Sequence, residues 1–337
     1  MSPAEEEPTL ETALIAPPRR RALEEGPAVL LVNTKSRSGK EAFEKARGAL
    51  AARGIPLLRS HAISRPQRLP QLVSEAVALG ARRILVGGGD GTVSCAVSCL
   101  LGRDVTLGVV PLGTGNDFAR SLGIPASVEA ACEVIAQGYT ARVDVGLANG
   151  RPFLNASSLG LATAIARRLT KRLKQKMGKL AYPVAAATQI WEHHPFRVRM
   201  QADTQSLDLE VLQLVVGNGR YHGAGNMVAP DAALDDRRLH VYAITAPSAD
   251  KGREGTGLGQ IEDLATLARV ALSLRRGDHV EHPAVTYLRT SRLYVEAEPV
   301  QEVNADGELI GRTPMLFELV PAALRVYAPA PEEPTAH

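Results

Sequence analysis

The sequence predicts an α/β fold joined to an all-β fold: an N-terminal doubly wound α/β domain and a C-terminal antiparallel β-sandwich domain. Two patterns predict this division. Over residues 28–137 short apolar runs alternate with stretches of helical periodicity, which is typical of parallel strands connected by helices. From about residue 139 apolar residues recur mostly at every second position, as in antiparallel strands with one buried face. The length of 337 residues also exceeds one typical core.

The first domain is predicted to contain four parallel strands, each followed by a helix. The expected strands are 28–32, 57–62, 84–86 and 105–110, and the expected helices lie at 40–53, 69–79, 92–101, after 111–120, and at 128–137. In such a sheet, ligands bind outside the carboxyl ends of the strands. We therefore expect the polar loops that follow the strands to meet in one cleft.

The second domain is predicted to begin with a hairpin. A strand at 139–147 leads into Asn149-Gly150, a strong two-residue hairpin signal, and 152–158 is expected to pair back. Further strands are expected at 196–202, 207–216, 239–244 and 286–296, a mobile Gly-rich loop at 251–260, and last strands at 315–326 that return to the first domain. The predicted division is 1–27 disordered leader, 28–147 first domain, 148–328 second domain and 329–337 tail.

The stretch Gly87-Gly88-Gly89-Asp90-Gly91-Thr92 joins a buried strand to a helix. Glycines let the backbone approach a ligand closely, and free N–H groups at a helix start favour an anion. An aspartate in such a turn would repel phosphate unless a cation, most simply Mg²⁺, lies between them. The alternative is an ordinary turn in which Asp90 caps the helix. The motif favours phosphate binding.

Two other loops carry polar residues at strand ends. Residues 33–40 contain Lys35, Arg37 and Lys40, which could hold a polyphosphate, although a solvated polar turn would look the same. Residues 111–120 read PLGTGNDFAR. Together with GGDGT, this second loop resembles the bacterial diacylglycerol kinase (lipid kinase) family, which is related to sphingosine kinases and more distantly to NAD kinases. The resemblance extends, with gaps, over about residues 28–328.

The resemblance implies a nucleotide-binding first domain, a lipid-binding second domain, and phosphorylation of a lipid hydroxyl, most naturally that of diacylglycerol or a related glycerolipid, with ATP and Mg²⁺. It also implies the site residues. For the nucleotide they are Asn33, Lys35, Ser36, Lys40, Gly88, Gly89, Asp90, Gly91, Thr92, Gly113, Thr114, Gly115 and Asn116. For catalysis they are Asp90 and Asp117 towards Mg²⁺, Asp306 as general base, and Glu308 in the same charge network. For a separate structural Mg²⁺ they are Ala233, Asp236 and Arg238.

Several positions depart from the family pattern or carry an alternative reading. Thr34 stands where proline is usual, Ser94-Cys95 where Asn-Glu is common, and Arg237 where the turn usually has glycine. Asp144 matches an acidic position of the family's charge network, with a strand-end surface residue as the alternative. His222, in a glycine-rich turn, is expected to be structural.

Composition limits the partners and the compartment. A net charge of +3 does not indicate nucleic acid, and three cysteines without CxxC spacing do not indicate disulfides or zinc. Without an apolar run of about 18 residues, we expect a cytoplasmic protein that touches membranes only peripherally. The basic stretch 167–179, with Leu169, Leu173 and Met177 four apart, predicts either a membrane-surface helix or a solvated helix packed on the sandwich. A homodimer is left open.

The lack of an acidic residue at one place in the chain constrains the identity of the lipid. Sphingosine kinases carry an acidic residue near the stretch that corresponds to 159–166, and this chain has none there. The substrate headgroup is therefore expected to be neutral or anionic. Two rival functions are kept: an NAD kinase-like enzyme, which would share only GGDGT, and a non-catalytic lipid-binding protein on a kinase scaffold. A dehydrogenase is disfavoured because GxGxxG with a following acid is missing.

Overall fold

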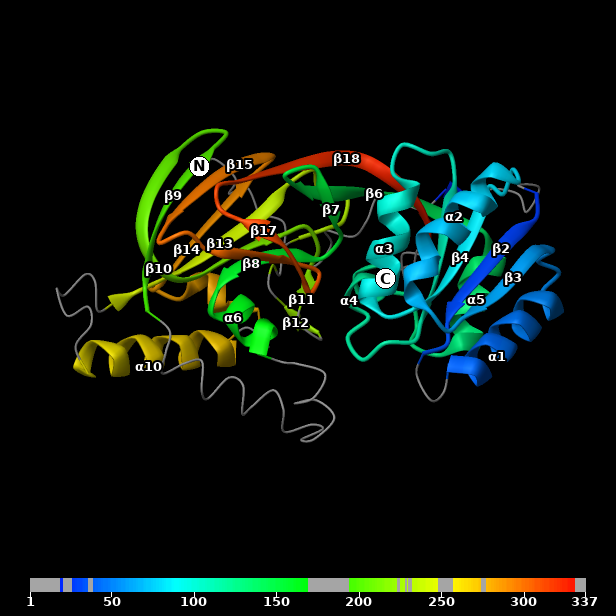
Figure 1. The fold of residues 1–337 in the computed structure, drawn as a ribbon, viewed down its shortest axis with the longest axis horizontal. Helices are drawn as coiled ribbons and strands as arrows, with labels where there is room; N and C mark the ends of the chain where they lie inside the picture. Colours follow the sequence, from blue (N-terminus) through cyan, green and yellow to red (C-terminus); the bar gives the residue numbers. More distant parts are fainter. Residues whose placement is uncertain are drawn as a thin grey trace, which may run out of the picture.

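The chain forms an α/β domain with a parallel sheet and an antiparallel β-sandwich domain, as the sequence predicts (Figure 1). The computed structural model describes residues 19–20, 26–35, 39–168, 194–222, 225–227, 229, 232–247, 257–273 and 277–330. Among these residues, no helix is long and apolar enough to cross a membrane.

The first domain is built on a sheet in the order β3-β2-β4-β5, with all pairs parallel. Its elements in chain order are β2 (Ala28–Asn33), α1 (Gly39–Ala52), β3 (Leu57–Ile63), η1 (Pro66–Arg68), α2 (Leu69–Ala78), β4 (Arg83–Gly88), α3 (Asp90–Leu100), β5 (Thr106–Pro111), α4 (Asp117–Ser121) and α5 (Val128–Gln137). The chain leaves β2 in one direction to form β3 and then crosses back to form β4. The carboxyl ends of β2 and β4 therefore form a topological switch point, where ligands bind in such folds.

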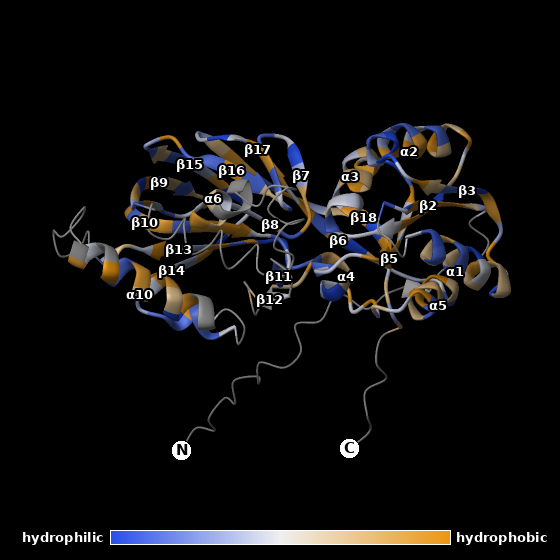
Figure 2. Ribbon diagram, turned by 60° about the horizontal axis from the view of Figure 1, so that its bottom comes forward, coloured by the Kyte–Doolittle hydropathy of each residue, from blue (hydrophilic) through white to orange (hydrophobic). Residues whose placement is uncertain are grey.

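Helices cover both faces of this sheet. α1 and α5 pack together on one face, while α2 and α3 lie on the other. In α1 the buried residues Phe43, Ala46 and Leu50 recur at helical spacing and face Leu30 and Leu85 of the sheet. In Figure 2 the strands β2 and β5 are coloured mainly as hydrophobic, which matches their position between two helical layers.

The second domain consists of antiparallel strands in the order β17-β16-β8-β10-β9-β15-β18, with β13 and β14 joined through β10. The bounds are β6 (Tyr139–Ala148), β7 (Arg151–Phe153), β8 (Ala156–Gly160), α6 (Leu161–Arg168), β9 (Phe196–Ala202), β10 (Ser206–Gly217), β11 (Tyr221–His222), β12 (Asn226–Met227), β13 (Leu239–Thr245), α10 (Gly257–Ser273), η3 (Asp278–Glu281), β14 (Val285–Thr290), β15 (Arg292–Glu298), β16 (Glu302–Ala305), β17 (Glu308–Arg312) and β18 (Met315–Tyr327).

Aromatic rings fill the core of the sandwich. Phe153 and Phe317 are fully buried and meet edge to face, with centroids 6.3 Å apart and ring planes at 88°. A Cβ on Gly146 would come within 2.3 Å of the Phe153 ring, so only glycine fits beneath it. On the outer face, α10 contributes Leu267 and Val270 to an apolar cluster with β10 and β13.

The long strands β6 and β18 connect the two domains. β18 pairs with β15 at its start, with β6 along most of its length, and in parallel with β5 at its end, where Arg325 lies opposite Thr106 (Figure 1). The predicted return of the last strand to the first domain is therefore confirmed.

The β6–β18 ladder contains a bulge that is closed by Asp144. The register shifts between Val320 and Leu324, and Ala322 has φ 49°. The buried Asp144 carboxylate accepts hydrogen bonds from the N–H of Ala322 and from the N–H of Arg237, both at 2.7 Å. Asp144 is therefore not a surface residue, and its carboxylate bridges β6, β18 and the turn before β13.

Four sequence predictions are wrong in detail. Residues 152–158 do not form one strand: β7 pairs with β6, but β8 turns away to pair with β10 and β16. Residues 286–296 likewise divide at Ser291 into β14 and β15, because Ser291 donates to Asp203 rather than continuing a ladder. Residues 257–260 of the predicted loop begin α10. Arg19–Arg20, expected to be disordered, pair with β6 as β1.

The Asp144 bridge gives a stability prediction. Asp144→Ala would remove two charge-assisted hydrogen bonds, and we expect the free energy of unfolding to fall by about 2–4 kcal/mol, since each hydrogen bond to a charged group contributes about 1.5–3 kcal/mol and removal of the buried charge offsets part of the loss. The measurement is urea denaturation. Asp208→Ala, which removes an exposed carboxylate paired with Arg197, is the control and should cost less than about 1 kcal/mol. Equal effects of the two changes would contradict the bridging role.

Candidate active site

The glycine-rich loop between β4 and α3 is packed too tightly for side chains. A Cβ on Gly88 would lie 2.5 Å from the Thr92 Cβ atom, and a Cβ on Gly113 would lie 2.6 Å from the Gly89 Cα atom. The backbone at the ends of β4 and β5 is therefore in direct contact. Next to Gly91, by contrast, a Cβ would meet nothing within 4 Å. The first turn of α3 thus has open space beside it.

The end of β2 lies against the same turn. Asn33 donates from Nδ2 to the Thr92 hydroxyl at 3.0 Å, and its Oδ1 accepts the N–H of Lys35 at 3.1 Å. One amide side chain therefore connects the loop after β2 to the first turn of α3. The predicted convergence of these two loops is what the fold produces at its switch point.

A cavity of about 510 Å³ opens in front of this turn. It is lined by Asn33, Lys35, Ile63, Pro66, Gln67, Leu69, Gly89, Asp90, Gly91, Thr92, Cys95 and Glu308. Its apolar wall, from the end of β3 to the start of α2, suits an aromatic base. The start of α3 suits phosphate, because the first N–H groups of a helix lack intrahelical partners.

Two carboxylates lie beside the cavity: that of Asp90, which begins α3, and that of Asp117, which begins α4. The Asp90 Oδ1 atom accepts the N–H of Phe118 at 3.3 Å, and the buried Asp117 Oδ1 atom accepts the N–H of Gly225 at 2.7 Å. Burial raises the pKa of Asp90, and the nearby charge of Asp117 raises it further. Two carboxylates at neighbouring positions, one of them with a raised pKa, fit the oxygen ligands that Mg²⁺ prefers.

Asp306 reaches the site from the second domain. It lies in the turn between β16 and β17 with φ 46°, followed by Gly307 with φ 88°. Its two carboxylate oxygens accept the N–H groups of Leu154 at 2.7 Å and Asn155 at 2.9 Å. Asp306 and Gly307 thus form the two-residue turn of a β-hairpin, and the aspartate is held in one orientation.

A second cavity, of about 360 Å³, joins the two halves of the site. It is lined by Pro70, Gly91, Ser94, Cys95, Ser98, Cys99, Gly150, Arg151, Pro152, Ala305, Asp306, Glu308 and Ile310. Gly91, Cys95 and Glu308 line both cavities. Because Gly91 and Asp306 both line this second cavity, the glycine loop of the first domain and the Asp306 turn of the second face the same space.

The structure brings together most, but not all, of the predicted nucleotide residues. Asn116, at φ 52°, closes the loop after β5 by bonding both ways with Gly113, at 2.8 and 3.0 Å. Thr114 and Gly115 lie on that loop but line neither cavity. Lys40 is exposed at the start of α1, and Ser36 lies outside the described residues.

His222, which is expected from the sequence to be structural, lies near the candidate site. It is the last residue of β11, which packs against α4. Burial lowers the pKa of His222, while the negative charges of Asp306, Asp117 and Asp90 oppose that shift. The imidazole therefore lies among the three carboxylates of the site. Its neighbourhood comes from three distant segments, so only the glycine-rich stretch around it marked the region in sequence.

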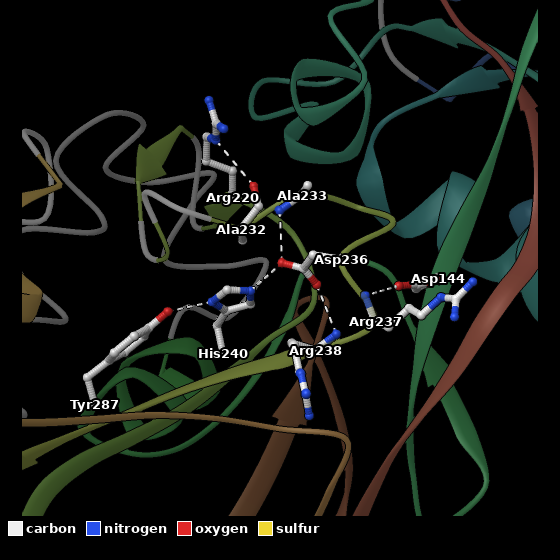
Figure 3. A network of polar contacts seen from close by, with 9 residues as sticks. All are labelled: Asp144, Arg220, Ala232, Ala233, Asp236, Arg237, Arg238, His240 and Tyr287. Carbon is white, nitrogen blue, oxygen red and sulfur yellow. Dashed lines mark hydrogen bonds and ion pairs between the residues drawn. The ribbon is translucent and has the colours of Figure 1, made fainter. Parts of the chain in front are cut away.

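The turn predicted to hold a structural Mg²⁺ contains a dense hydrogen-bond network (Figure 3). The Asp236 carboxylate accepts the N–H of Ala233 at 3.1 Å and the N–H of Arg238 at 2.9 Å. Its Oδ2 atom also lies 2.6 Å from Nε2 of the buried His240, whose Nδ1 atom is 2.5 Å from the Tyr287 hydroxyl.

This donor set fits a hydrogen-bonded carboxylate better than a magnesium ligand. Mg²⁺ requires near-octahedral oxygen ligands, whereas the groups directed at the Asp236 carboxylate are N–H donors. One tautomer satisfies the whole chain, with Nε2–H donating to Asp236 and Tyr287 donating to Nδ1. The predicted ion at this turn stays a prediction, and no chemical step is assigned to it.

Profiles of two protein families match the chain. The diacylglycerol kinase catalytic domain matches residues 27–148, and the YegS C-terminal NAD kinase beta sandwich-like domain matches residues 157–328. A Pseudomonas aeruginosa protein named "Probable lipid kinase YegS-like" is 35% identical over 77% of this chain and 81% of its own length. A "Diacylglycerol kinase" from Staphylococcus carnosus is 28% identical over 73% of this chain and 76% of its own.

Solved structures resemble the fold over nearly its whole length. A Bacillus anthracis protein described as a "putative diacylglycerol kinase" is 26% identical, with a TM-score of 0.72 over 90% of this chain and 95% of its own. A second crystal structure from the same organism, of a diacylglycerol kinase, has a TM-score of 0.66 at 24% identity, over 90% of this chain and 96% of its own.

The raised pKa of Asp90 predicts a conflict between function and stability. A carboxyl whose pKa is higher in the folded than in the unfolded protein lowers the stability of the fold when the pH is above the folded-state pKa. This loss of stability disappears as the pH falls below the pKa of the carboxyl in the unfolded protein. Asp90→Asn should therefore raise the thermal midpoint of the ligand-free protein by a few degrees at neutral pH, as roughly 1 kcal/mol does.

Scanning calorimetry over a pH series would check this expectation. The difference between Asp90→Asn and the wild type should shrink as pH falls, because protonated Asp90 no longer carries the penalty. Asp104→Asn alters an exposed carboxylate and serves as the control. A lower midpoint for Asp90→Asn at neutral pH would show that its hydrogen bonds outweigh its desolvation.

Proposed function

The chain belongs to the diacylglycerol kinase and lipid kinase family and is a lipid kinase, and on that premise we propose that it transfers the γ-phosphoryl group of ATP to the hydroxyl of diacylglycerol or a related glycerolipid. The observation that carries the proposal is that the glycine loop and Asp306 line the same cavity, and that Glu308 lines both this cavity and the one in front of the glycine loop. The γ-phosphoryl group of ATP and the lipid hydroxyl can meet there in line, as phosphoryl transfer requires.

The first domain would bind the nucleotide. The N–H groups of Gly89, Asp90 and Gly91, at the start of α3, offer donors and a positive dipole end to the phosphates. Lys35 lines the same cavity and adds charge. The wall formed by Ile63, Pro66 and Leu69 excludes water from an aromatic base. Positioning of this kind supplies much of the catalysis when the transition state is loose.

Asp90 and Asp117 would hold Mg²⁺, directly or through water. When bound, the ion neutralises charge that develops on the phosphoryl oxygens. The two carboxylates themselves are fixed by backbone N–H groups, of Phe118 for Asp90 and of Gly225 for Asp117. Because Gly225 belongs to the second domain, its bond to Asp117 also helps to keep the site closed.

Asp306 would accept the proton of the lipid hydroxyl. Each of its oxygens already takes one backbone N–H, so the carboxylate cannot rotate but retains further lone pairs for the hydroxyl. A carboxylate is a weak base for an alcohol, yet the proton leaves late, once the oxygen is bonding to phosphorus. Glu308 would contribute charge at the junction of the two cavities.

The substrate would be reached at a membrane surface. The stretch 159–166 carries no acid, which favours a neutral or anionic headgroup over an amine. The basic segment 167–179 would provide peripheral contact with anionic lipid; beyond Arg168, it lies outside the described residues. A cytoplasmic, membrane-associated enzyme follows from this proposal, and a homodimer is compatible with it.

Incubation of the purified protein with labelled ATP, with and without Mg²⁺, and a panel of lipids tests the proposal directly. Label should enter diacylglycerol or a related glycerolipid, only when Mg²⁺ is present, and diacylglycerol should outcompete sphingosine. Preferential labelling of sphingosine or of NAD would overturn the assignment of the substrate.

The role of Asp306 can be separated from nucleotide binding. Asp306→Asn keeps the shape but removes the proton acceptor, so turnover should fall by roughly 10²–10⁴-fold, the usual contribution of acid–base catalysis. The affinity for ATP with Mg²⁺, measured by calorimetry, should change little, because Asp306 lies in the second domain. Asp90→Asn should weaken both. Retention of more than about a tenth of turnover in Asp306→Asn would place the base elsewhere.

A further inference from the structure

The loop between β7 and β8 controls the orientation of Asp306. Residues 154–155 lie where the chain leaves the β6 ladder and has not yet joined β10, so their peptide groups have no partners in either sheet ladder. The N–H groups of Leu154 and Asn155 bind the Asp306 carboxylate. Whatever fixes these two peptide groups therefore fixes the proposed base.

Asn218 binds the opposite side of the same peptide groups. It follows β10 and is only 1% exposed. Its Nδ2 atom donates to the Leu154 carbonyl at 3.0 Å, and its main-chain N–H donates to the Asn155 carbonyl at 2.8 Å. The Leu154 carbonyl and the Asn155 N–H belong to one planar peptide unit. Hydrogen bonds therefore run in series from Asn218 through that unit to Asp306.

The same amide also connects the loop to the junction between the domains. Asn218 Nδ2 donates a second hydrogen bond, of 3.1 Å, to the main-chain oxygen of Asp144 in β6. β6 pairs with β18, which reaches the parallel sheet of the first domain. One side chain thus links the strand that spans both domains to the peptide unit that holds Asp306.

The chemistry of this position requires an amide nitrogen. Two carbonyl oxygens face Nδ2, so the opposite orientation of the amide would set oxygen against oxygen. The Asn218 Oδ1 atom is buried and has no hydrogen-bond partner among the described residues. A buried acceptor left unpaired costs stability, which indicates that the residue is present for its two donors.

We infer that Asn218 is a positioning residue that orients Asp306 through the Leu154–Asn155 peptide unit. This inference rests on the proposed function, in which Asp306 is the base. Asn218→Asp preserves the shape but replaces the donor by an oxygen that repels both carbonyls. The peptide unit would then rotate or shift and carry Asp306 out of line with the hydroxyl.

The test compares Asn218→Asp with Gln213→Glu. Gln213 lies on β10 and also has a buried amide side chain, but its hydrogen bonds are with Ala162 and Leu214 and do not lead towards Asp306. Asn218→Asp should lower kcat by about 10- to 100-fold, as a misplaced catalytic group does, with ATP affinity within about twofold of wild type. Gln213→Glu should change kcat by less than about threefold. Equal losses in both variants, or a loss in Asn218→Asp confined to KM for ATP, would overturn the inference.

Combination with Asp306→Asn separates this inference from the assignment of the base. If Asn218 acts through Asp306, Asn218→Asp should lower turnover by less than about twofold in the Asp306→Asn background. A full additional loss there would overturn the positioning role. A fully active Asp306→Asn would instead overturn the assignment of the base. Should Asn218→Asp fail to fold, as judged by circular dichroism, Asn218→Ala removes the donors without adding charge and carries the same expectations.

Discussion

The antiparallel pairing of β6 with β18 determines how the proposed catalytic groups of the first domain lie relative to Asp306 of the second. The two strands run through both domains, and β18 ends in parallel contact with β5 (Figure 1). The Asp306 turn therefore keeps a fixed position relative to α3, without a flexible linker between them. The bulge at Ala322 would break this ladder, but Asp144 accepts the exposed N–H. A single buried carboxylate thus preserves the strand pair on which the closed site depends.

The proposed catalytic residues occur where regular hydrogen bonding stops. The chain leaves β4 at Gly89, turns between β16 and β17 at Asp306, and passes between two ladders at Leu154 and Asn155. At each of these places the backbone offers N–H groups that the sheets do not use. The N–H groups of Leu154 and Asn155 bind the Asp306 carboxylate, and those at the start of α3 would bind phosphate. The proposed binding groups are therefore backbone N–H groups that are left without a partner in a sheet or helix where the strands and helices are interrupted.

Local pattern was sufficient to predict the parallel strands and the helices of the first domain. Helical periodicity and buried strands identify β2, β4 and β5, and close packing around Gly88 and Gly89 explains the first two glycines of GGDGT. The breaks at residues 154–155 and at Ser291 could not be predicted in this way, because no Gly or Pro marks the chain at either place. Long-range bonds, to Asp306 and Asp203 respectively, end the strands there. Asn218 was missed for the same reason, since its partners Asp144 and Leu154 come from distant segments.

The Asp236 turn shows how a departure from the family pattern can be accommodated. Arg237 has φ 60°, a conformation that costs a non-glycine residue of order 1–3 kcal/mol. That conformation directs its N–H to Asp144, so the strain is offset by one charge-assisted hydrogen bond at the domain junction. The neighbouring carboxylate of Asp236 is stabilised by His240, which Tyr287 orients (Figure 3). The side chain of Arg237 is exposed and takes no part in these bonds, so the turn depends on the backbone of residue 237 rather than on its identity.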